Sequence, residues 1–467
     1  MFHSTRGKAA VSAAEAIING IAEDGGLYVI EELPTIRYKE MLAEDYTTMA
    51  SRIIKAFFPD FTLEEIQKEV KEAYACFDVE EVVHLHEAKD FFFLELWHGP
   101  TLAFKDLALV ILPRLMRLAK EKLGRNQKTT ILTATSGDTG GAALNGFKSI
   151  IGMQVIVLYP EDGVSSIQES QMLSFQADNT EILAVKGNFD DCQKIVKEFF
   201  QENPELSLSS ANSINIGRLI PQIVYYFYSY ISLVKEEKID LDEEVDFVVP
   251  TGNFGNIFAG FYAKMLGLPI HNLVVASNEN DVLTEFFNQG SYNKNRTFHK
   301  TNSPSMDILV SSNLERLLYY ACEEDCQSVK NLMEQLKHKG KYEFRNPFPF
   351  FKAYKTSERE TLELIQEVYK RYGYLIDPHT AVAYGAFKKN ADLNYKSIIL
   401  STASPFKFPT VIKEAFCLSM NEEFKIIEEM NQKFSIPVPK ALNYPIRKKK
   451  GIEQEHIKSY IKEKIQC

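Results

Sequence analysis

Short β-rich runs alternate with helix-length segments through the middle of this 467-residue chain. The β-rich runs contain mainly Val, Ile, Thr, Leu and Phe, and they cover 91–97, 129–135, 153–159, 180–185, 245–250 and 273–277. Helix-length segments lie between them, for example 138–148 and 189–201. Strands joined through helices align in parallel, because the helix returns the chain to the starting edge of the sheet. The alternation therefore predicts an α/β protein with parallel sheets flanked by helices.

The pattern also divides the chain into regions. The first ninety residues have a mainly helical pattern, so we predict an additional N-terminal domain over 1–90. The alternating core extends over 91–425, with a smaller subdomain at about 130–235. A polar stretch at about 288–312 interrupts the alternation and is predicted to be an irregular insertion or a lid. The remaining residues, 426–467, are predicted to form a C-terminal tail.

The net charge limits the partners of this chain. Its 53 Lys and Arg residues against 63 Asp and Glu residues give a charge of −10. General binding to nucleic acid or to an anionic membrane needs a cationic surface, so we predict neither partner. The basic run at 447–450 is interpreted as a solvated part of the tail. The most apolar long stretch, 219–234, is shorter than the roughly 20 residues that span a bilayer, so it is predicted to be a buried helix.

Cysteine usage and the first residues indicate the compartment. Six scattered cysteines are too few for a disulfide framework. Cys322 and Cys326 lie four residues apart, but no second Cys or His pair at zinc-site spacing accompanies them, so no metal site is predicted. The first twenty residues lack the continuous apolar region of a secretory signal. The sequence therefore predicts a reduced, cytoplasmic protein.

Three turns follow predicted strands and open predicted helices. They are TSGDTGG at 135–141, TGNFGN at 251–256 and, with a looser pattern, STASPFKF at 401–408. Glycine lets the backbone approach a ligand closely, and the start of a helix presents free N–H groups and a positive dipole end. Neither Gly-rich turn has the Gly-Lys-Ser/Thr ending of a P-loop or a clear dinucleotide fingerprint. The two turns together predict sites for an anionic small ligand.

Lys105 lies in WHGPTLAFKDLAL, near the start of an apolar helix that is predicted over 104–124 and interrupted at Pro113. Most lysines on half-buried helices extend their amine into water. A desolvated lysine with a lowered pKa is instead suited to forming a Schiff base. A lysine together with separate anion-binding turns fits a cofactor that has both an aldehyde and a phosphate, and pyridoxal phosphate has both.

Six segments resemble threonine synthases of the bacterial and fungal type. The segments cover 4–34, 98–106, 135–144, 211–227, 252–260 and 377–386. The resemblance extends in order from about residue 4 to residue 408. It implies the tryptophan-synthase-β type of fold (fold type II of the pyridoxal-phosphate enzymes) and pyridoxal 5'-phosphate as the cofactor. It further implies a lyase that converts O-phospho-L-homoserine and water to L-threonine and phosphate, the last step of threonine biosynthesis.

The resemblance also assigns roles to individual residues. Lys105 would be the Schiff-base lysine and would carry protons between the substrate carbons. The residues implied to bind the cofactor phosphate are Gly252, Asn253, Phe254, Gly255 and Asn256, and Thr402 would meet the pyridine nitrogen. The loop implied to hold the substrate carboxylate is Ser136, Gly137, Asp138 and Thr139. The residues implied to hold the substrate phosphate are Asn212, Ser213 and Arg218, with Asn215 nearby.

Several of these residues also have purely structural interpretations. Asn212 and Ser213 precede a long apolar helix and could cap it. Asp138 could act only as a first-turn partner of the helix dipole. His98 is an alternative general base, although a histidine with apolar neighbours is more often structural. The sequence departs from the common family pattern at Ser404 and Phe406, which changes the expected contacts around the cofactor ring.

Two other functions remain compatible with the sequence. One is a related pyridoxal-phosphate lyase that stops after elimination and releases 2-oxobutanoate. The other is a non-catalytic relative, which an intact Lys105 and two anion-binding turns argue against. Because the reaction passes through a water-reactive step, we expect domain closure, with the insertion at 288–312 taking part. The oligomeric state leaves no signal in the sequence.

Overall fold

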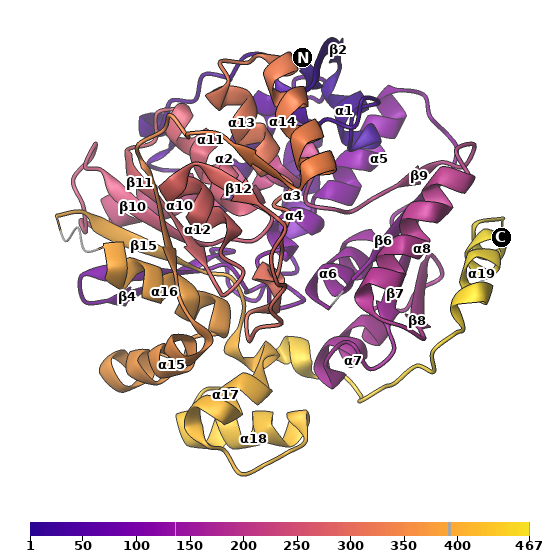
Figure 1. The fold of residues 1–467 in the computed structure, drawn as a ribbon. Helices are drawn as coiled ribbons and strands as arrows, with labels where there is room; N and C mark the ends of the chain where they lie inside the picture. Colours follow the sequence, from indigo (N-terminus) through magenta and orange to yellow (C-terminus); the bar gives the residue numbers. More distant parts are fainter. Residues whose placement is uncertain (136, 391–393, 467) are drawn as a thin grey trace.

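The computed structural model describes residues 1–135, 137–390 and 394–466 (Figure 1). The N-terminal elements are β1 (Phe2–Ser4), β2 (Gly7–Val11), α1 (Ala13–Asn19), β3 (Tyr28–Ile30), η1 (Tyr38–Met41), α2 (Tyr46–Phe57) and α3 (Leu63–Tyr74). The three strands form an antiparallel sheet in the order β2-β1-β3. The prediction of a mainly helical N-terminal region was therefore incomplete, since strands of three to five residues are too short to show a period in sequence.

Helix α1 shows how local sequence sets the boundaries of an element. Its N-terminus is closed by a capping box, in which Ser12 and Glu15 each bond the other's backbone N–H. The helix ends at Gly20, whose φ of 69° suits a residue without a side chain. Gly25 and Gly26 follow a few residues later, where the chain turns to enter β3.

The larger sheet has six strands in the order β14-β11-β10-β15-β5-β4. Its strands are β4 (His84–Ala88), β5 (Phe91–Glu95), β10 (Val245–Pro250), β11 (Ile270–Ser277), β14 (Phe351–Lys355) and β15 (Lys396–Ser401). All neighbours are parallel except β4, which pairs antiparallel with β5. Helix α16 (Pro378–Asn390) packs across β14, β11, β10 and β15, while α11 (Gly255–Met265) packs on β10 and β11. The larger sheet therefore confirms the predicted parallel arrangement.

The smaller sheet is fully parallel, in the order β8-β7-β6-β9. Its elements are β6 (Thr129–Ala134), α6 (Asp138–Phe147), β7 (Met153–Pro160), α7 (Ser166–Ser174), β8 (Thr180–Val185), α8 (Phe189–Glu202) and β9 (Leu208–Ser209). Alternate residues of a strand point to opposite faces. Ile131 and Val155 accordingly join the main core, whereas Leu132 and Ile156 join a second core under α8. Burial on both faces explains the continuous apolar runs in the sequence.

Further helices connect and cover these sheets. They are α4 (Asp106–Leu109), α5 (Leu112–Lys122), α9 (Ile216–Leu219), η2 (Ile220–Gln222), α10 (Ile223–Lys235), α12 (Val282–Gln289), α13 (Leu314–Ala321), α14 (Cys326–Lys339) and α15 (Glu358–Tyr372). The helix predicted over 104–124 is interrupted as expected, because the chain breaks after α4 and Pro113 lies in the first turn of α5. Among the described residues, no helix is both long enough and apolar enough to cross a membrane. The division into domains at about 90 and 425 stays a prediction.

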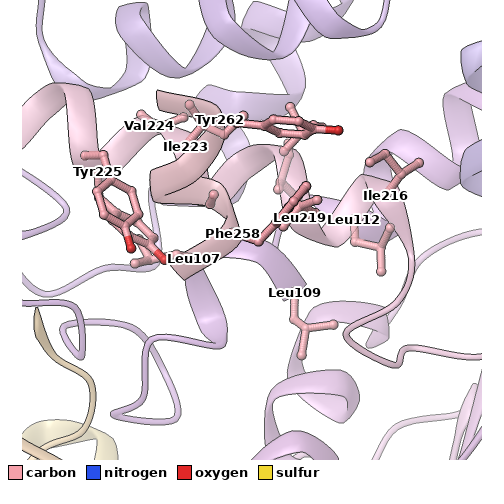
Figure 2. Close-up of a cluster of buried hydrophobic side chains, with 14 of the residues drawn as sticks. Leu107, Leu109, Leu112, Ile216, Leu219, Ile223, Val224, Tyr225, Phe258 and Tyr262 are labelled. Carbon is pink, nitrogen blue, oxygen red and sulfur yellow. The ribbon is translucent and has the colours of Figure 1, made fainter. Parts of the chain in front are cut away.

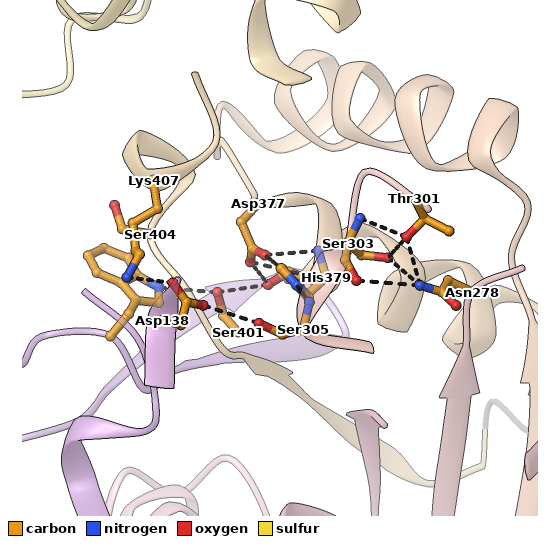
Figure 3. Close-up of polar contacts among 12 residues, drawn as sticks. Asp138, Asn278, Thr301, Ser303, Ser305, Asp377, His379, Ser401, Ser404 and Lys407 are labelled. Atoms are coloured by element: carbon orange, nitrogen blue, oxygen red, sulfur yellow. Dashed lines mark hydrogen bonds and ion pairs between the residues drawn. The ribbon is translucent and has the colours of Figure 1, made fainter. Parts of the chain in front are cut away.

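The polar insertion at 288–312 is mostly irregular, as predicted, but it is anchored at several points. It contains β12 (Ser291–Asn293), which pairs with β13 (Lys341–Glu343), and the short turn η3 (Pro304–Met306). A polar network then ties it to the larger sheet, since the Asn278 amide after β11 donates to Thr301 and Ser303 (Figure 3). The same amide also donates to Asp307. The insertion therefore has a defined path beside the carboxyl ends of the strands.

The C-terminal segment is not a free tail. The predicted core ends with η4 (Pro405–Lys407) and α17 (Pro409–Phe416). The predicted tail at 426–467 begins within α18 (Glu423–Phe434) and continues with η5 (Lys440–Leu442) and α19 (Gln454–Gln466). After α18 the chain crosses to the smaller sheet, where α19 lies against α8 (Figure 1). Ile452 forms a parallel bridge with Val185 at the edge strand β8, and Ile457 and Ile461 are fully buried. The basic run at 447–450 is largely exposed, as is Ile446 before it. This segment covers an otherwise open sheet edge.

Candidate active site

A single apolar core positions the two most important cations of the site. Leu107 and Leu109 of α4 and Ile216 and Leu219 of α9 are buried in this core, together with residues of α10 and α11 (Figure 2). Lys105 is the residue directly before α4, and Arg218 lies within α9. Packing of the apolar side chains therefore determines where both cations lie, although more than one hundred residues separate them in sequence.

Lys105 is desolvated. Its side chain is 10% exposed, and its Nζ donates to Asp138 Oδ2 at 3.2 Å and to Ser305 Oγ at 3.0 Å. Burial lowers the pKa of Lys105; the Asp138 carboxylate opposes this, and the positive charges of Lys407 and Arg218 lower the pKa further. The sequence left open whether this lysine extends into water or is desolvated, and the geometry favours the second interpretation. A buried amine with a lowered pKa is suited to nucleophilic and proton-transfer chemistry.

Asp138 connects several groups of the site. Lys407 Nζ lies 2.8 Å from Asp138 Oδ1, Ser305 Oγ donates to Oδ2 at 3.1 Å, and Gln168 Nε2 donates to Oδ1 at 3.2 Å. Burial raises the pKa of Asp138, but Lys407 and Lys105 outweigh it and hold that pKa well below its usual range. Asp138 does lie in the first turn of α6, but its carboxylate also binds two lysines. It is therefore more than a partner of the helix dipole.

The loop before α6 needs glycine at one position. Gly137 has a φ of 139°, and a Cβ at this position would lie 2.5 Å from the Gln168 side chain. The N–H groups of Gly137 and Gly140 both donate to Thr135 Oγ1, which shapes the turn. Thr139 is half-buried at the start of α6, and Ser136 lies outside the described residues. The loop brings the first-turn N–H groups of α6 next to Lys105 and Asp138.

The turn between β10 and α11 fits a phosphate group. Phe254 adopts the left-handed conformation (φ 64°) directly before α11, and Gly252 approaches the insertion so closely that a Cβ would meet Ser305 O at 2.8 Å. Asn256 Oδ1 accepts hydrogen bonds from Tyr225 and Tyr226, at 2.6 and 3.0 Å. The Asn256 Nδ2 is buried and has no hydrogen-bond partner in the described part of the chain.

An unpaired buried amide N–H is costly, so the Asn256 side chain fits an acceptor that the protein itself does not supply. The first-turn N–H groups of α11 complete such a site for an anion. Gly255 belongs to the same turn, and Asn253 contributes its backbone carbonyl, which accepts from the N–H and side chain of Asn313. The residues present therefore fit the phosphate of a cofactor bound at Lys105.

Thr402 follows β15 and is buried. Phe104 N–H donates to Thr402 O at 2.9 Å, so the residue lies beside the segment that carries Lys105. Ser404 and Phe406 are the two residues that depart from the family pattern. The Ser404 hydroxyl accepts a hydrogen bond from the Phe406 N–H and thereby caps the η4 turn. Phe406 itself is buried in the core below α16 and α17. Both residues therefore stabilise the turn that presents Thr402 and Lys407.

Arg218 is a buried cation without a carboxylate partner. Its Nη1 donates to Ala211 O at 2.7 Å, and no carboxylate of the described residues lies within ion-pair distance. Burial lowers the pKa of Arg218 to about 10, so the group stays charged at neutral pH. Arg316 is also buried, but its guanidinium donates to Tyr28 O, Ile214 O and the Asn313 side chain. Arg316 is thus satisfied by the protein, whereas Arg218 has capacity for a bound anion.

The neighbours of Arg218 in the loop before α9 differ in their availability. Asn212 is exposed and Ser213 is half-buried, and neither side chain makes a hydrogen bond within the described residues. Asn215 is fully buried: its Oδ1 accepts from Gly217 N–H and its Nδ2 donates to Ile17 O, both at 2.9 Å. Asn215 therefore caps α9 and ties it to α1, which uses its Oδ1 and one of its two Nδ2 hydrogens.

His98 is engaged by two carboxylates. Its ring nitrogens lie 2.8 Å from Asp78 Oδ1 and 2.7 Å from Glu95 Oε2. Burial alone would lower the pKa of His98, but these hydrogen bonds raise it to about 9. A histidine held in its charged form at neutral pH cannot act as a general base. The geometry thus favours the structural interpretation of His98.

Two residues of the site were missed by the sequence reasoning. Lys407 lies inside the STASPFKF turn, where a basic residue just after a strand end was a usable signal. Its side chain is 1% exposed and it also donates to Thr101 O at 2.6 Å. Ser305 lies in the polar insertion, and no local pattern distinguishes it from the other serines there. Only the folded chain brings Ser305 to Lys105.

Comparison with known proteins agrees with this geometry. The family model described as "Pyridoxal-phosphate dependent enzyme" matches residues 75–404, and the models "Threonine synthase N terminus" and "Threonine synthase, C-terminal" match 1–74 and 380–442. The threonine synthase of Pseudomonas aeruginosa is 38% identical over 427 residues, which cover 88% of this chain and 89% of that protein. The chain belongs to the threonine synthase family. Its cofactor is accordingly pyridoxal 5'-phosphate, and the protein is a pyridoxal-phosphate-dependent lyase of fold type II.

Two further relatives of this family are informative. The crystal structure of the threonine synthase from Brucella melitensis, described as bound to PLP, is 35% identical, with a TM-score of 0.89 over 100% of this chain and 99% of that one. A human protein named threonine synthase-like 1 is 38% identical over 432 residues, covering 86% of this chain but 58% of the human protein. The relatives of this chain thus include a protein whose name does not say which product it forms.

Proposed function

We propose that this protein converts O-phospho-L-homoserine and water to L-threonine and phosphate, the last step of threonine biosynthesis. The observation that carries the proposal is Arg218, a buried guanidinium without a carboxylate partner among the described residues, whose charge acts on Lys105. A substrate with a phosphate at its far end supplies the missing anion. An Arg fork can bind two phosphate oxygens at once.

Pyridoxal phosphate, when bound at Lys105, supplies an electron sink for the electrons released at the substrate α-carbon. We propose that Gly252, Asn253, Phe254, Gly255 and Asn256 hold its phosphate and that Thr402 meets its ring nitrogen. Asn256 supports this role through its unpaired buried N–H group. Thr402 supports it through its position beside the Lys105 segment.

Lys105 is proposed to remove the α-proton and to move protons at the β-carbon. Its lowered pKa leaves more of the amine neutral than for a lysine in water, as a base requires. The loop Ser136, Gly137, Asp138 and Thr139 is proposed to hold the substrate carboxylate through N–H groups at the start of α6. Lys407 supports this arrangement because it neutralises Asp138, which would otherwise repel a carboxylate.

Arg218, Asn212 and Ser213 are proposed to bind the substrate phosphate and to stabilise it as it leaves. Asn215 takes a positioning part, since it caps the helix that carries Arg218. The two halves of the site lie on different sheets, with the carboxylate loop after β6 and the phosphate turn after β10. Closure of the smaller sheet toward the larger one would exclude water until the hydration step, with the insertion at 288–312 taking part.

The five described cysteines are free, which agrees with the proposed cytoplasmic location. The decisive experiment for the activity is product analysis with O-phospho-L-homoserine. We expect L-threonine and phosphate in equal amounts. Phosphate with 2-oxobutanoate and ammonia would instead identify a lyase that stops after elimination. A Lys105→Ala variant should retain some cofactor but lose turnover, and a purified protein that gains no absorbance on addition of pyridoxal phosphate would refute the proposal.

A further inference from the structure

Ser305 belongs to the polar insertion, 200 residues from Lys105 in sequence, yet it joins the site. Lys105 Nζ donates to Ser305 Oγ at 3.0 Å, and the same hydroxyl donates to Asp138 Oδ2 at 3.1 Å. Lys105 therefore reaches the Asp138 carboxylate by two routes, one direct and one through the Ser305 hydroxyl. A hydroxyl is suited to this bridge because it can accept and donate at the same time.

The backbone of Ser305 is held by a histidine. Ser305 N–H donates to His379 Nε2 at 3.2 Å, and His379 Nδ1 lies 2.8 Å from Asp377 Oδ1 (Figure 3). A ring nitrogen that accepts a hydrogen bond carries no proton, so the proton of this ring lies on Nδ1 and is donated to Asp377. Asp377 thus selects the tautomer that can receive the Ser305 amide.

The Asp377–His379 pair is itself rigidly placed. Both residues are almost completely buried at the start of α16, where Asp377 also accepts the backbone N–H groups of His379 and Thr380. Helix α16 packs across four strands of the larger sheet. The polar network around Asn278 orients the preceding part of the insertion, but its hydrogen bonds go to Thr301, Ser303 and Asp307. The Ser305 amide depends instead on His379.

We propose that His379 is a positioning residue, which, oriented by Asp377, holds Ser305 so that the Ser305 hydroxyl shares the Lys105 amine with Asp138. The part of the insertion that contains Ser305 is thus held by a residue of α16, which packs on the larger sheet, rather than by hydrogen bonds within the insertion. The significance of Ser305 for turnover rests on the proposed function. The placement itself does not, because it can be measured on the holoenzyme without substrate.

The first test is amide hydrogen exchange of the holoenzyme in the peptide that contains Ser305. His379→Leu removes the acceptor, and we expect exchange of this amide to become about tenfold faster. His379→Gln places a carbonyl oxygen near the position of Nε2 and should restore protection to within about twofold of the wild type. Ser305→Ala keeps the backbone N–H and should remain protected. Unchanged exchange in the Leu variant would overturn the proposal.

The second test is the pH titration of the visible absorbance of the cofactor bound at Lys105. Ser305→Ala removes the hydroxyl that accepts a hydrogen bond from Lys105 Nζ. We therefore expect the proton affinity of this nitrogen to fall at least threefold. His379→Leu should shift the titration in the same direction, and His379→Gln should reverse the shift. The charged groups that face Lys105, namely Asp138, Lys407 and Arg218, are unchanged in all three variants.

Ser291→Ala is the matched control, because it removes a half-buried hydroxyl from β12 of the same insertion, where this hydroxyl donates to Glu343. It should leave both measurements at wild-type values. A shift in Ser305→Ala without one in a folded His379→Leu protein would show that the histidine does not position the serine. If His379→Leu does not fold, the proposal is judged from the same two measurements on His379→Gln and Ser305→Ala. Failure to form threonine in the product analysis would leave these outcomes unaffected.

Discussion

The position of Lys407 leads to a quantitative prediction about how fast the apoprotein binds its cofactor. Its ammonium group lies 2.8 Å from one oxygen of Asp138, while Lys105 binds the other oxygen at 3.2 Å. Lys407 thus acts on Lys105 in two ways. It takes part of the attraction of Asp138, and it repels the positive form of Lys105 directly. Replacing Lys407 by Met removes the charge while keeping a side chain of similar length in a buried position.

The magnitude follows from Coulomb's law. Two ammonium groups on opposite oxygens of one carboxylate lie roughly 6 Å apart, which gives a repulsion of about 3 kcal/mol at an effective dielectric constant of about 20. Without Lys407, the charged form of Lys105 is therefore stabilised, and the fraction of neutral amine falls by about a hundredfold where the ammonium form dominates. The neutral amine is the form that attacks the aldehyde of the cofactor.

The assay is the rate at which the apoprotein binds pyridoxal phosphate, followed by absorbance from pH 6 to pH 10. For Lys407→Met we expect a rate about 30- to 100-fold below wild type at low pH, approaching the wild-type rate at high pH. Lys407→Arg keeps the charge and should remain close to the wild-type profile. Circular dichroism checks that both variants fold. A Met variant whose profile matches the wild type, or moves to lower pH, would refute this electrostatic argument.

Three further predictions concern other parts of the chain. Arg218→Leu should reduce kcat/KM for the phosphorylated substrate by at least about a hundredfold, from the loss of charge-assisted hydrogen bonds, while the cofactor absorbance persists; an unchanged kcat/KM would exclude Arg218 from phosphate binding. The folded-state pKa of His98 is raised from 6.5 to about 9, so its contribution to stability is complete below pH 6.5 and is lost as the pH rises through 9. This contribution is at most roughly 3 kcal/mol, and a His98→Gln variant should show a flatter dependence of Tm on pH over this range. Gly146→Ala would place a Cβ 1.9 Å from Leu109 O, so α6 must move away from α4; we expect a loss of about 3 kcal/mol or more in urea unfolding, and a wild-type midpoint would contradict this packing.

Most strands of the two parallel sheets were predictable because their signal is local. Runs such as 153–159 and 245–250 are buried on both faces, so they appear in sequence as continuous β-branched and apolar stretches. The short strands of the N-terminal sheet and of the insertion escaped prediction, since three to five residues are too few to show an alternating pattern. The edge strand β14, FKAYK, alternates weakly and was also missed.

The C-terminal segment illustrates a second limit. Its charged composition indicated a solvated tail, yet Ile457 and Ile461 are fully buried against the smaller sheet. Two apolar residues four positions apart on a short helix are compatible with either outcome. The contact with α8 and with the edge of β8 decides it, and these partners lie more than 250 residues earlier in the chain.

The sequence by itself determined where the two Gly-bearing turns lie, because each is a contiguous strand–turn–helix unit whose glycines and first-turn amides are set by local backbone geometry. The structure has both turns between a strand and a helix, as predicted, while their binding of an anion stays a prediction. The tertiary structure alone decided how the charges are shared. Asp138 binds both Lys105 and Lys407, and Ser305 reaches the site from the insertion. Arg218 has no carboxylate partner among the described residues, while Asn215 caps α9. Such pairings depend on burial and on contacts between distant segments, and neither is encoded in any single stretch of sequence.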